Sequence, residues 1–253
     1  FDTVSPWGTV SGLAALIGVG VGSIVVAVII VVAISLFMPT NSDTLINCVS
    51  RGQGVLAGEC GTWMLGLSGF WGIVLAASFY ALSHVRSDGS PQSVLLLNRS
   101  GLAWWQYIVI MVAMIGLLYL LEVVMSLVTG ATQADLERGL EHLKAIVENG
   151  GIYQWLLLLF VVAVVAPVSE ELAFRGFMFT TLVKTRIGFM GAAIVTSATW
   201  TLLHYTYTWQ ILLVLFVFGV LLAYVVWRTG SVWTGIVVHG LNNLISSIVL
   251  VLR

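Results

Sequence analysis

Charged residues are scarce in this sequence of 253 residues, because Asp, Glu, Lys and Arg together make up only 8% of the chain. A typical soluble domain carries about 25% charged residues, and too few are present here to cover a surface that faces water. Hydrophobic residues make up 59% of the chain, and the mean hydropathy is +1.05. We therefore predict an integral membrane protein, and the length suits one domain.

Basic residues are also few, with 10 Lys and Arg against 11 Asp and Glu and a net charge of −1. The sequence has no basic stripe that could neutralise the phosphates of a nucleic acid. This balance argues against a nucleic-acid partner.

Long apolar runs dominate the remainder of the chain. A helix needs about 20 apolar residues to cross about 30 Å of hydrocarbon, and the runs are too continuous for the alternating strands of a barrel. Since the backbone in a bilayer must pair within a helix or a closed barrel, we predict an all-α, polytopic transmembrane helix bundle with about seven spans. The approximate segments are 10–38, 62–84, 104–129, 152–183, 187–206, 209–227 and 231–252. The fourth is overlong, and Pro167 is the expected place of a bend.

Residues 132–149, "TQADLERGLEHLKAIVEN", differ from the spans because acids dominate the positions between four aliphatic residues at helical spacing. The four are Leu136, Leu140, Leu143 and Ile146. We predict an amphipathic helix that rests on the membrane surface or caps the bundle, with partner binding as the alternative. Residues 1–151 would then hold three spans and this extramembrane helix, while residues 152–253 would hold the last four spans of one integral membrane domain.

The loops predict the orientation of the chain. If successive spans alternate in direction, five basic residues lie on one side of the membrane. On the other side the basic residues are accompanied by acidic residues. The five are Arg86, Arg99, Lys184, Arg186 and Arg228. The positive-inside rule therefore puts the amino terminus in the cytoplasm. Cys48 and Cys60 both fall in the first outside loop, where a disulfide suits an oxidising compartment; two buried or free thiols are the alternative.

The stretch "PVSEELAFRGF", residues 167–177, places Glu170, Glu171 and Arg175 after an apolar run. An ionised side chain near a bilayer centre costs roughly 3 kcal/mol, so such residues usually mark function. Glu171 and Arg175 are four apart with the acid first, which favours an ion pair on a helix. Glu170 lies about 100° around the helix from Glu171, so it needs another partner or is available for chemistry.

Other polar groups occur in two later spans. "WTLLH" places Trp200 and His204 one helical turn apart, and "HGLNN" places His239 and Asn243 one turn apart. A lone intramembrane histidine is more often a hydrogen-bonded packing element. Two histidines, an asparagine and a spare glutamate in separate spans would each be costly in lipid, so we expect them to converge.

Their convergence would supply the groups for hydrolysis. A carboxylate in an apolar cavity is a competent general base for water, and a neighbouring imidazole can share the proton. A histidine N–H and an asparagine amide make a suitable pair of donors for an oxyanion. Together these groups indicate hydrolysis of an acyl bond, here a peptide bond. No serine or cysteine stands in a nucleophile setting, because Cys48 and Cys60 lie in the loop and Ser169 has no adjacent histidine.

"EELAFR", then an aromatic-xxx-His, then His-xxx-Asn, in this order on three late spans, resembles the CPBP family of intramembrane proteases. The family includes the Ras-converting CAAX endopeptidases and bacterial members linked to bacteriocin processing or immunity. The flanking "AP", "FRG" and "RTGSVWTGIVVHGLNN" also resemble it, so the resemblance covers roughly residues 152–247. Trp200 stands where the family commonly has Phe, a swap of one aromatic residue for another.

The resemblance implies a role for each residue of the set. Glu170 would be the water-activating base, assisted by His204, and His239 with Asn243 would form the oxyanion site. The second motif glutamate and its arginine, Glu171 and Arg175, would hold the helix in shape.

The resemblance leaves the metal question open, because the family has been discussed both as metalloproteases and as metal-free glutamate proteases. Glu170, His204 and His239 would be the ligands of a zinc ion, although no HExxH is present. An asparagine in the set suits the oxyanion role better than zinc, so we expect no cofactor.

We therefore predict an intramembrane endopeptidase, a peptide hydrolase, with residues 152–253 as its four-span catalytic core. Its substrate would be a membrane-embedded or lipid-anchored protein or peptide in a bacterial or archaeal cell membrane. Alternatives are a non-catalytic peptide-binding or immunity factor and a transporter with a proton relay. Transport is disfavoured because no inverted repeat is evident. The CAAX label describes ancestry and does not assign a prenylated substrate.

Overall fold

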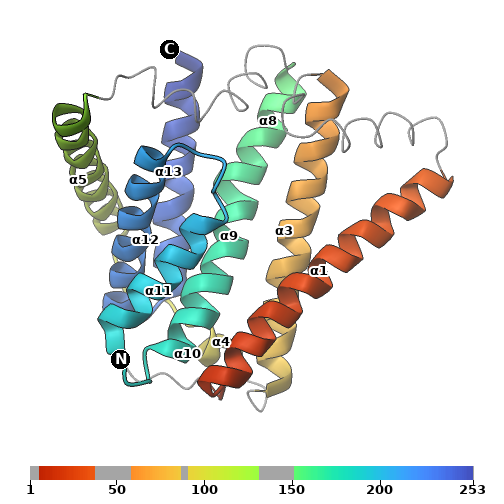
Figure 1. Ribbon diagram of the computed structural model, residues 1–253, viewed down its shortest axis with the longest axis horizontal. Coiled ribbons are helices and arrows are strands. Elements are labelled where there is room, and N and C mark those ends of the chain that lie inside the picture. The colour runs from red at the N-terminus through yellow and green to blue at the C-terminus, as the bar shows by residue number, and fades with distance from the viewer. Residues whose placement is uncertain (1–5, 38–57, 87–90, 131–150, 253) are drawn as a thin grey trace.

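The computed structural model describes residues 6–37, 58–86, 91–130 and 151–252, in which every regular element is a helix. The predicted all-α architecture is confirmed (Figure 1). The elements outside the central helix are α1 (Thr9–Phe37), α3 (Gly58–Arg86), α4 (Pro91–Val94), α5 (Trp104–Thr129), α11 (Gly188–Leu202), α12 (Trp209–Thr229) and α13 (Val232–Leu252).

The central helix runs continuously over Ile152–Leu182, a length of 31 residues. Two stretches within it have the wider π-helical turn, which is often found at functional sites. In chain order its parts are α8 (Ile152–Phe160), η2 (Val161–Val165), α9 (Ala166–Glu171), η3 (Leu172–Phe179) and α10 (Thr180–Leu182).

Six helices of the described residues are long and apolar enough to cross a membrane. They include α1, α3, α5, the central helix, α12 and α13. Large hydrophobic side chains such as Val112 and Leu120 on α5 face outward, where lipid replaces water as their surroundings. The chain is a polytopic integral membrane protein.

The seventh predicted span, residues 187–206, forms the shorter helix α11 of 15 residues. At about 1.5 Å per residue it is roughly 22 Å long, less than the hydrocarbon thickness of about 30 Å. Its end tightens because the N–H groups of Leu203 and His204 bond to carbonyls three residues back. Residues 203–208 then form turns before α12 begins.

Several sequence-based expectations fall on residues outside the described ranges. They include the amphipathic helix 132–149 and Cys48, one half of the expected disulfide, whereas Cys60 lies in the first turn of α3. The disulfide, the surface helix, the two-part division of the chain and the orientation of the amino terminus therefore stay predictions.

The helices pack around the central helix. Helix α3 packs along one side of the central helix, and α1 packs against α3. Helices α11 and α13 contact the central helix from other directions. Helix α12 packs against α11 and α13, and α5 covers α12 and α13 at the far edge (Figure 1). The polar residues of the central helix therefore face α11, α12 and α13, which carry the remaining motifs.

A π stretch precedes Pro167, the residue at which a bend was expected. The N–H of Ala166 bonds to the carbonyl of Val161, five residues back. Pro167 has no N–H, so in this register it cannot bond to the carbonyl of Val162. The side-chain amide of Asn243 on α13 donates to that carbonyl instead, at 2.9 Å. The proline thus creates an acceptor through which α13 is tied to the central helix.

Close approach of α13 at this point depends on Gly240. A Cβ added to Gly240 would lie 2.5 Å from the carbonyl oxygen of Ala163. Because that neighbour is backbone of a packed helix, it cannot rotate away as a flexible side chain would. A side chain here would therefore push α13 away from the central helix.

We expect Gly240→Ala to lower the free energy of unfolding by about 1–3 kcal/mol, the usual cost of overpacking. Thermal unfolding of the detergent-purified protein measures the change. Gly116→Ala on α5 is the matched control, because nothing lies within 4 Å of the added Cβ. Equal unfolding temperatures for the two variants would contradict the close approach.

Candidate active site

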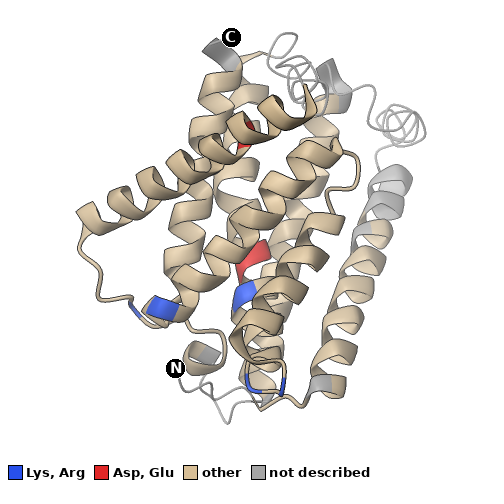
Figure 2. Cartoon of the chain, turned by 60° about the vertical axis from the view of Figure 1, so that its left-hand side comes forward, with Lys and Arg blue, Asp and Glu red and all other residues tan. Residues whose placement is uncertain are grey.

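The polar residues of the bundle gather where α9, α11 and α13 meet. Glu170 and Glu171 end α9, Trp200 lies in the last turn of α11, and His239 lies near the middle of α13. Figure 2 shows acidic and basic segments next to each other at mid-height of the bundle, with mostly uncharged helix above and below. A group of charged side chains therefore lies inside an otherwise apolar helix bundle.

Glu171 and Arg175 form an ion pair, with Arg175 Nη1 donating to Glu171 Oε1 at 2.8 Å and both side chains 0% exposed. Arg175 Nη2 also donates to the carbonyl of Gly219 on α12, at 3.2 Å. The guanidinium carbon lies 4.9 Å from the ring centroid of Trp200, in cation–π range. The pair thus connects the central helix to α11 and α12.

His239 lies between the two glutamates and is 3% exposed. Its Nδ1 is 3.0 Å from Glu171 Oε1, which already accepts from Arg175, so Nδ1–H is the donor. Its Nε2 faces Glu170 Oε2 at 3.9 Å. Glu171 therefore fixes the orientation of the imidazole so that its other nitrogen points toward Glu170.

Glu170 has a partner different from that of Glu171, because Trp200 Nε1 donates to Glu170 Oε2 at 2.6 Å. Its side chain is 23% exposed, in contrast to the fully buried Glu171. The sequence suggested that Trp200 in place of Phe matters little. The structure shows a difference, because the indole N–H hydrogen-bonds to the carboxylate and a phenyl ring has no such donor.

His204 lies in the turns that follow α11, with its ring centroid 5.1 Å from that of Trp200. Its Nδ1 is 3.1 Å from the carbonyl of Trp200. A carbonyl only accepts, so Nδ1 carries the proton and Nε2 can accept one. Among the described residues no hydrogen bond joins His204 to Glu170; Trp200 lies between the two.

Tyr207 is a residue of this region that the sequence analysis missed. Its ring centroid is 5.7 Å from that of His204. Burial, and after it the negative charge of Glu170, raises the pKa of its phenol above the usual value. The phenol therefore stays protonated at neutral pH and can donate a hydrogen bond. Because Tyr207 lies in a turn, helical spacing gave no signal for it.

Asn243 lies one turn beyond His239 on α13, but its amide already donates one N–H to the carbonyl of Val162. An asparagine amide has two N–H protons, so a second is left for another acceptor. The structure thus gives Asn243 a packing role that the sequence did not predict.

Two glycines leave the space that the ion pair occupies. A Cβ added to Gly235 on α13 would lie 2.7 Å from Glu171 Oε2, and one added to Gly219 on α12 would lie 3.1 Å from Arg175 Nη2. Side chains at these positions would displace the charged groups. The site therefore needs glycine at these two positions as well as the charged residues.

Glu170, His204 and His239 are the residues that the sequence analysis named as the ligands of a zinc ion, if one were bound. In the described part of the chain, no three His, Cys, Asp or Glu side chains are grouped so that they could hold one metal ion. His239 Nδ1–H bonds to a carboxylate and His204 Nδ1–H to a backbone carbonyl, as in metal-binding histidines, but the two imidazoles and Glu170 are not grouped around one point. We therefore derive no step through a metal.

Glu171→Gln should lower the free energy of unfolding by about 3–5 kcal/mol, because it leaves the buried Arg175 guanidinium without its counter-charge. Thermal unfolding in detergent measures the loss. Glu170→Gln, the same substitution at the neighbouring, partly exposed position, is the control and should cost much less. If both variants unfold at the same temperature, the ion pair does not stabilise the fold.

A family model matches the C-terminal part of the chain. Residues 152–245 match the family model "Type II CAAX prenyl endopeptidase Rce1-like". The match begins with the central helix and includes Glu170, His204, His239 and Asn243. No curated protein and no solved structure matches the chain. The proteins that this family model describes are CAAX-type intramembrane proteases, which are peptide hydrolases. Residues 152–245 are thus similar to the Rce1-like CAAX proteases, the family that the motifs resemble.

Proposed function

We propose that the chain is an endopeptidase that hydrolyses a peptide bond within the membrane by means of water activated by Glu170. The observation that carries the proposal is the pairing of Glu170 Oε2 with His239 Nε2 across 3.9 Å. This distance is too long for a direct hydrogen bond. The two atoms are nevertheless close enough to bind the same small group.

An oxygen atom at about 2.8 Å from both partners, an ordinary hydrogen-bond length, would see them at an angle of roughly 90°. A water molecule tolerates such an angle, and so does the oxygen of a tetrahedral intermediate. The partial exposure of Glu170, at 23%, supports access of water to its carboxylate. These two features support Glu170 as the general base of the proposed mechanism.

In the proposed mechanism Glu170 takes a proton from water as the water oxygen attacks the scissile carbonyl carbon. The negative charge that develops on the carbonyl oxygen is stabilised by His239 and by the second N–H of Asn243. His239 donates from Nε2 when both ring nitrogens carry protons, since Nδ1–H is bound to Glu171. The proton held by Glu170 then passes to the leaving amine.

His204 and Tyr207 would assist at the other side of Trp200. The free Nε2 of His204 can accept a proton and later return it. The phenol of Tyr207, kept protonated by its surroundings, can donate a hydrogen bond to a substrate carbonyl or to water. Trp200 lies between His204 and Glu170, so substrate or water would connect these two residues.

The substrate would be a protein or peptide that is itself embedded in the membrane or anchored to it by lipid. Support comes from the position of the site among helices long enough to span a membrane and from the family model, which describes a CAAX prenyl endopeptidase. A soluble polypeptide would have to enter hydrocarbon with unpaired backbone groups, which costs several kcal/mol for each group. A lipid anchor would hold the scissile bond at the bilayer without that cost.

Glu170→Gln should reduce turnover at least about 10²-fold, because glutamine keeps the size of the side chain but cannot accept a proton. Membranes of cells that express the wild-type chain, the variant or neither are compared by mass spectrometry of new protein termini. A terminus that appears only with the wild type is the product. Glu122→Gln on α5, outside the site, is the matched control and should retain cleavage.

The outcomes of that comparison separate an enzyme from a binding protein. Near-normal cleavage by Glu170→Gln would remove the base assignment. If no new terminus appears, but a cellular effect such as bacteriocin immunity persists in both the wild type and the variant, the chain acts without catalysis.

Catalysis should need no bound metal. The active, detergent-purified protein is predicted to contain less than stoichiometric zinc by elemental analysis and to keep its activity after dialysis against a chelator. Stoichiometric zinc that is lost together with activity, and regained with it on addition of metal, would overturn the metal-free mechanism.

A further inference from the structure

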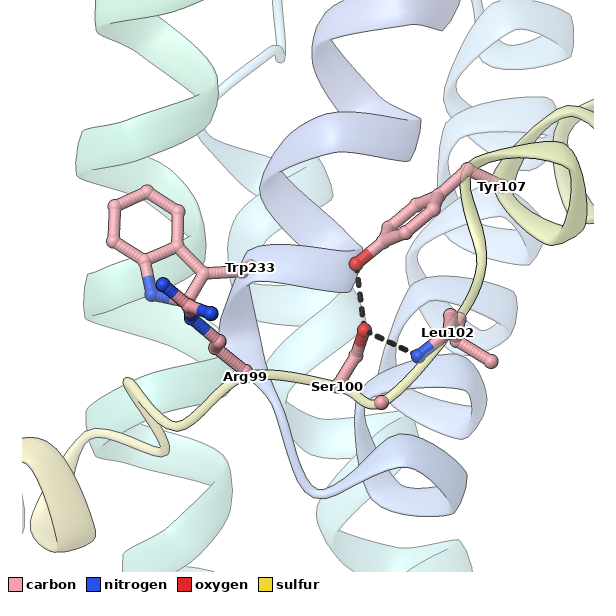
Figure 3. A pocket seen from close by; sticks show the side chains of 6 residues that line it. Arg99, Ser100, Leu102, Tyr107 and Trp233 are labelled. Atoms are coloured by element: carbon pink, nitrogen blue, oxygen red, sulfur yellow. Dashed lines mark hydrogen bonds between the residues drawn. The ribbon is translucent and has the colours of Figure 1, made fainter.

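We infer that a second site, at the basic end of the bundle, binds the phosphate headgroup of an anionic phospholipid. The site is a cavity of about 320 Å³ lined by Arg99, Ser100, Gly101, Leu102, Tyr107 and Trp233. Figure 3 shows Arg99 and Trp233 on one side and the hydroxyls of Ser100 and Tyr107 on the other. None of these residues belongs to the candidate active site.

The cavity is held in shape by three hydrogen bonds from residues 231–233, at the start of α13, to backbone carbonyls of the α4–α5 connection. The N–H of Val232 donates to the carbonyl of Leu96 at 2.8 Å, and the indole N–H of Trp233 donates to the carbonyl of Leu97 at 3.0 Å. The hydroxyl of Ser231 donates to the carbonyl of Asn98. A connection fixed in three places presents Arg99 and Ser100 in a defined position, so little order has to be created when a ligand binds.

The polar groups of the cavity are suited to a ligand that is negatively charged and accepts hydrogen bonds. Arg99 is an exposed cation that no acidic side chain of the described ranges pairs with. Ser100 Oγ accepts the N–H of Leu102 and lies 2.6 Å from Tyr107 Oη. Two hydroxyls that share one hydrogen bond keep one O–H proton to donate elsewhere. An arginine with a hydroxyl donor suits a phosphate.

The surroundings of the cavity place it at the level of lipid headgroups. Trp104, Trp105 and Trp233 are 76%, 53% and 43% exposed, and exposed tryptophans mark the interface between membrane and water. Apart from the buried pair at mid-height, the described Lys and Arg segments lie at this end of the bundle (Figure 2). Juxtamembrane basic residues attract anionic lipids.

The size of the cavity and the adjacent helix fit a lipid rather than a free ion. At about 30 Å³ for each water-sized group, the cavity holds roughly ten non-hydrogen atoms, about the size of a glycerophosphate headgroup. Ile108 and Val112 on α5 follow Tyr107 along the helix and are exposed. Acyl chains of a lipid bound in the cavity would contact these side chains.

The test uses the whole purified chain in detergent micelles doped with phosphatidylglycerol or phosphatidylcholine, with bound lipid counted by native mass spectrometry. The wild type should bind phosphatidylglycerol at least about fivefold more tightly than phosphatidylcholine, the contribution expected of one basic residue near a charged lipid. Arg99→Gln should remove that preference. Tyr107→Phe, which leaves the charge unchanged, should weaken binding about two- to tenfold through loss of the hydroxyl.

Arg228→Gln is the matched control, because it removes the same charge from the same end of the bundle, where the guanidinium lies 5.9 Å from the Trp227 ring. It should change binding less than twofold. If the wild type does not prefer phosphatidylglycerol, or if the two arginine variants lose equal binding affinity, the proposed site is wrong. The lipid is then attracted by the overall charge of this end of the bundle. Displacement of the lipid by millimolar inorganic phosphate would identify a site for soluble phosphate and overturn the lipid assignment.

Discussion

The buried Glu171–Arg175 ion pair is the interaction on which the rest of the site depends. Two charges inside a membrane protein are costly unless they are paired and hydrogen-bonded, and here every partner comes from a different helix. Glu171 orients His239 on α13, while Arg175 bonds to Gly219 on α12 and lies over Trp200 on α11. This one pair of charges therefore ties three neighbouring helices to the central one.

The need to pair buried charges gives the two adjacent glutamates different surroundings. Glu171 is fully buried and engaged by Arg175 and His239, so its carboxylate serves as a fixed charge. Glu170, one residue earlier, faces a different direction and remains partly exposed, with an indole N–H as its donor. This arrangement supports the proposed mechanism because the histidine that faces Glu170 is oriented by the glutamate next to it. The two acids act on the same imidazole from opposite sides.

Irregular backbone and glycines make the close packing of the site possible. The π stretch before Pro167 leaves a carbonyl that Asn243 binds, and Gly235, Gly219 and Gly240 leave space where side chains would collide with the pair or with backbone. Association of helices in lipid relies on small residues and hydrogen bonds, since the apolar surroundings give no hydrophobic driving force. Glycines and the asparagine on α12 and α13 therefore serve both packing and the candidate chemistry.

The sequence by itself predicted the class of the protein, the position of nearly every long helix of the described residues and most of the polar residues that meet at the candidate site. Apolar runs of about 20 residues have few alternatives to a helix in a bilayer, and the four-residue spacing of Glu171 and Arg175 already predicts their contact. The length of α11, the donor from Trp200 to Glu170, the bond from Asn243 to Val162 and the place of Tyr207 were decided only by the tertiary structure. Each depends on which residues of separate helices meet, and helical periodicity specifies the face of a residue but not the helix that packs against it.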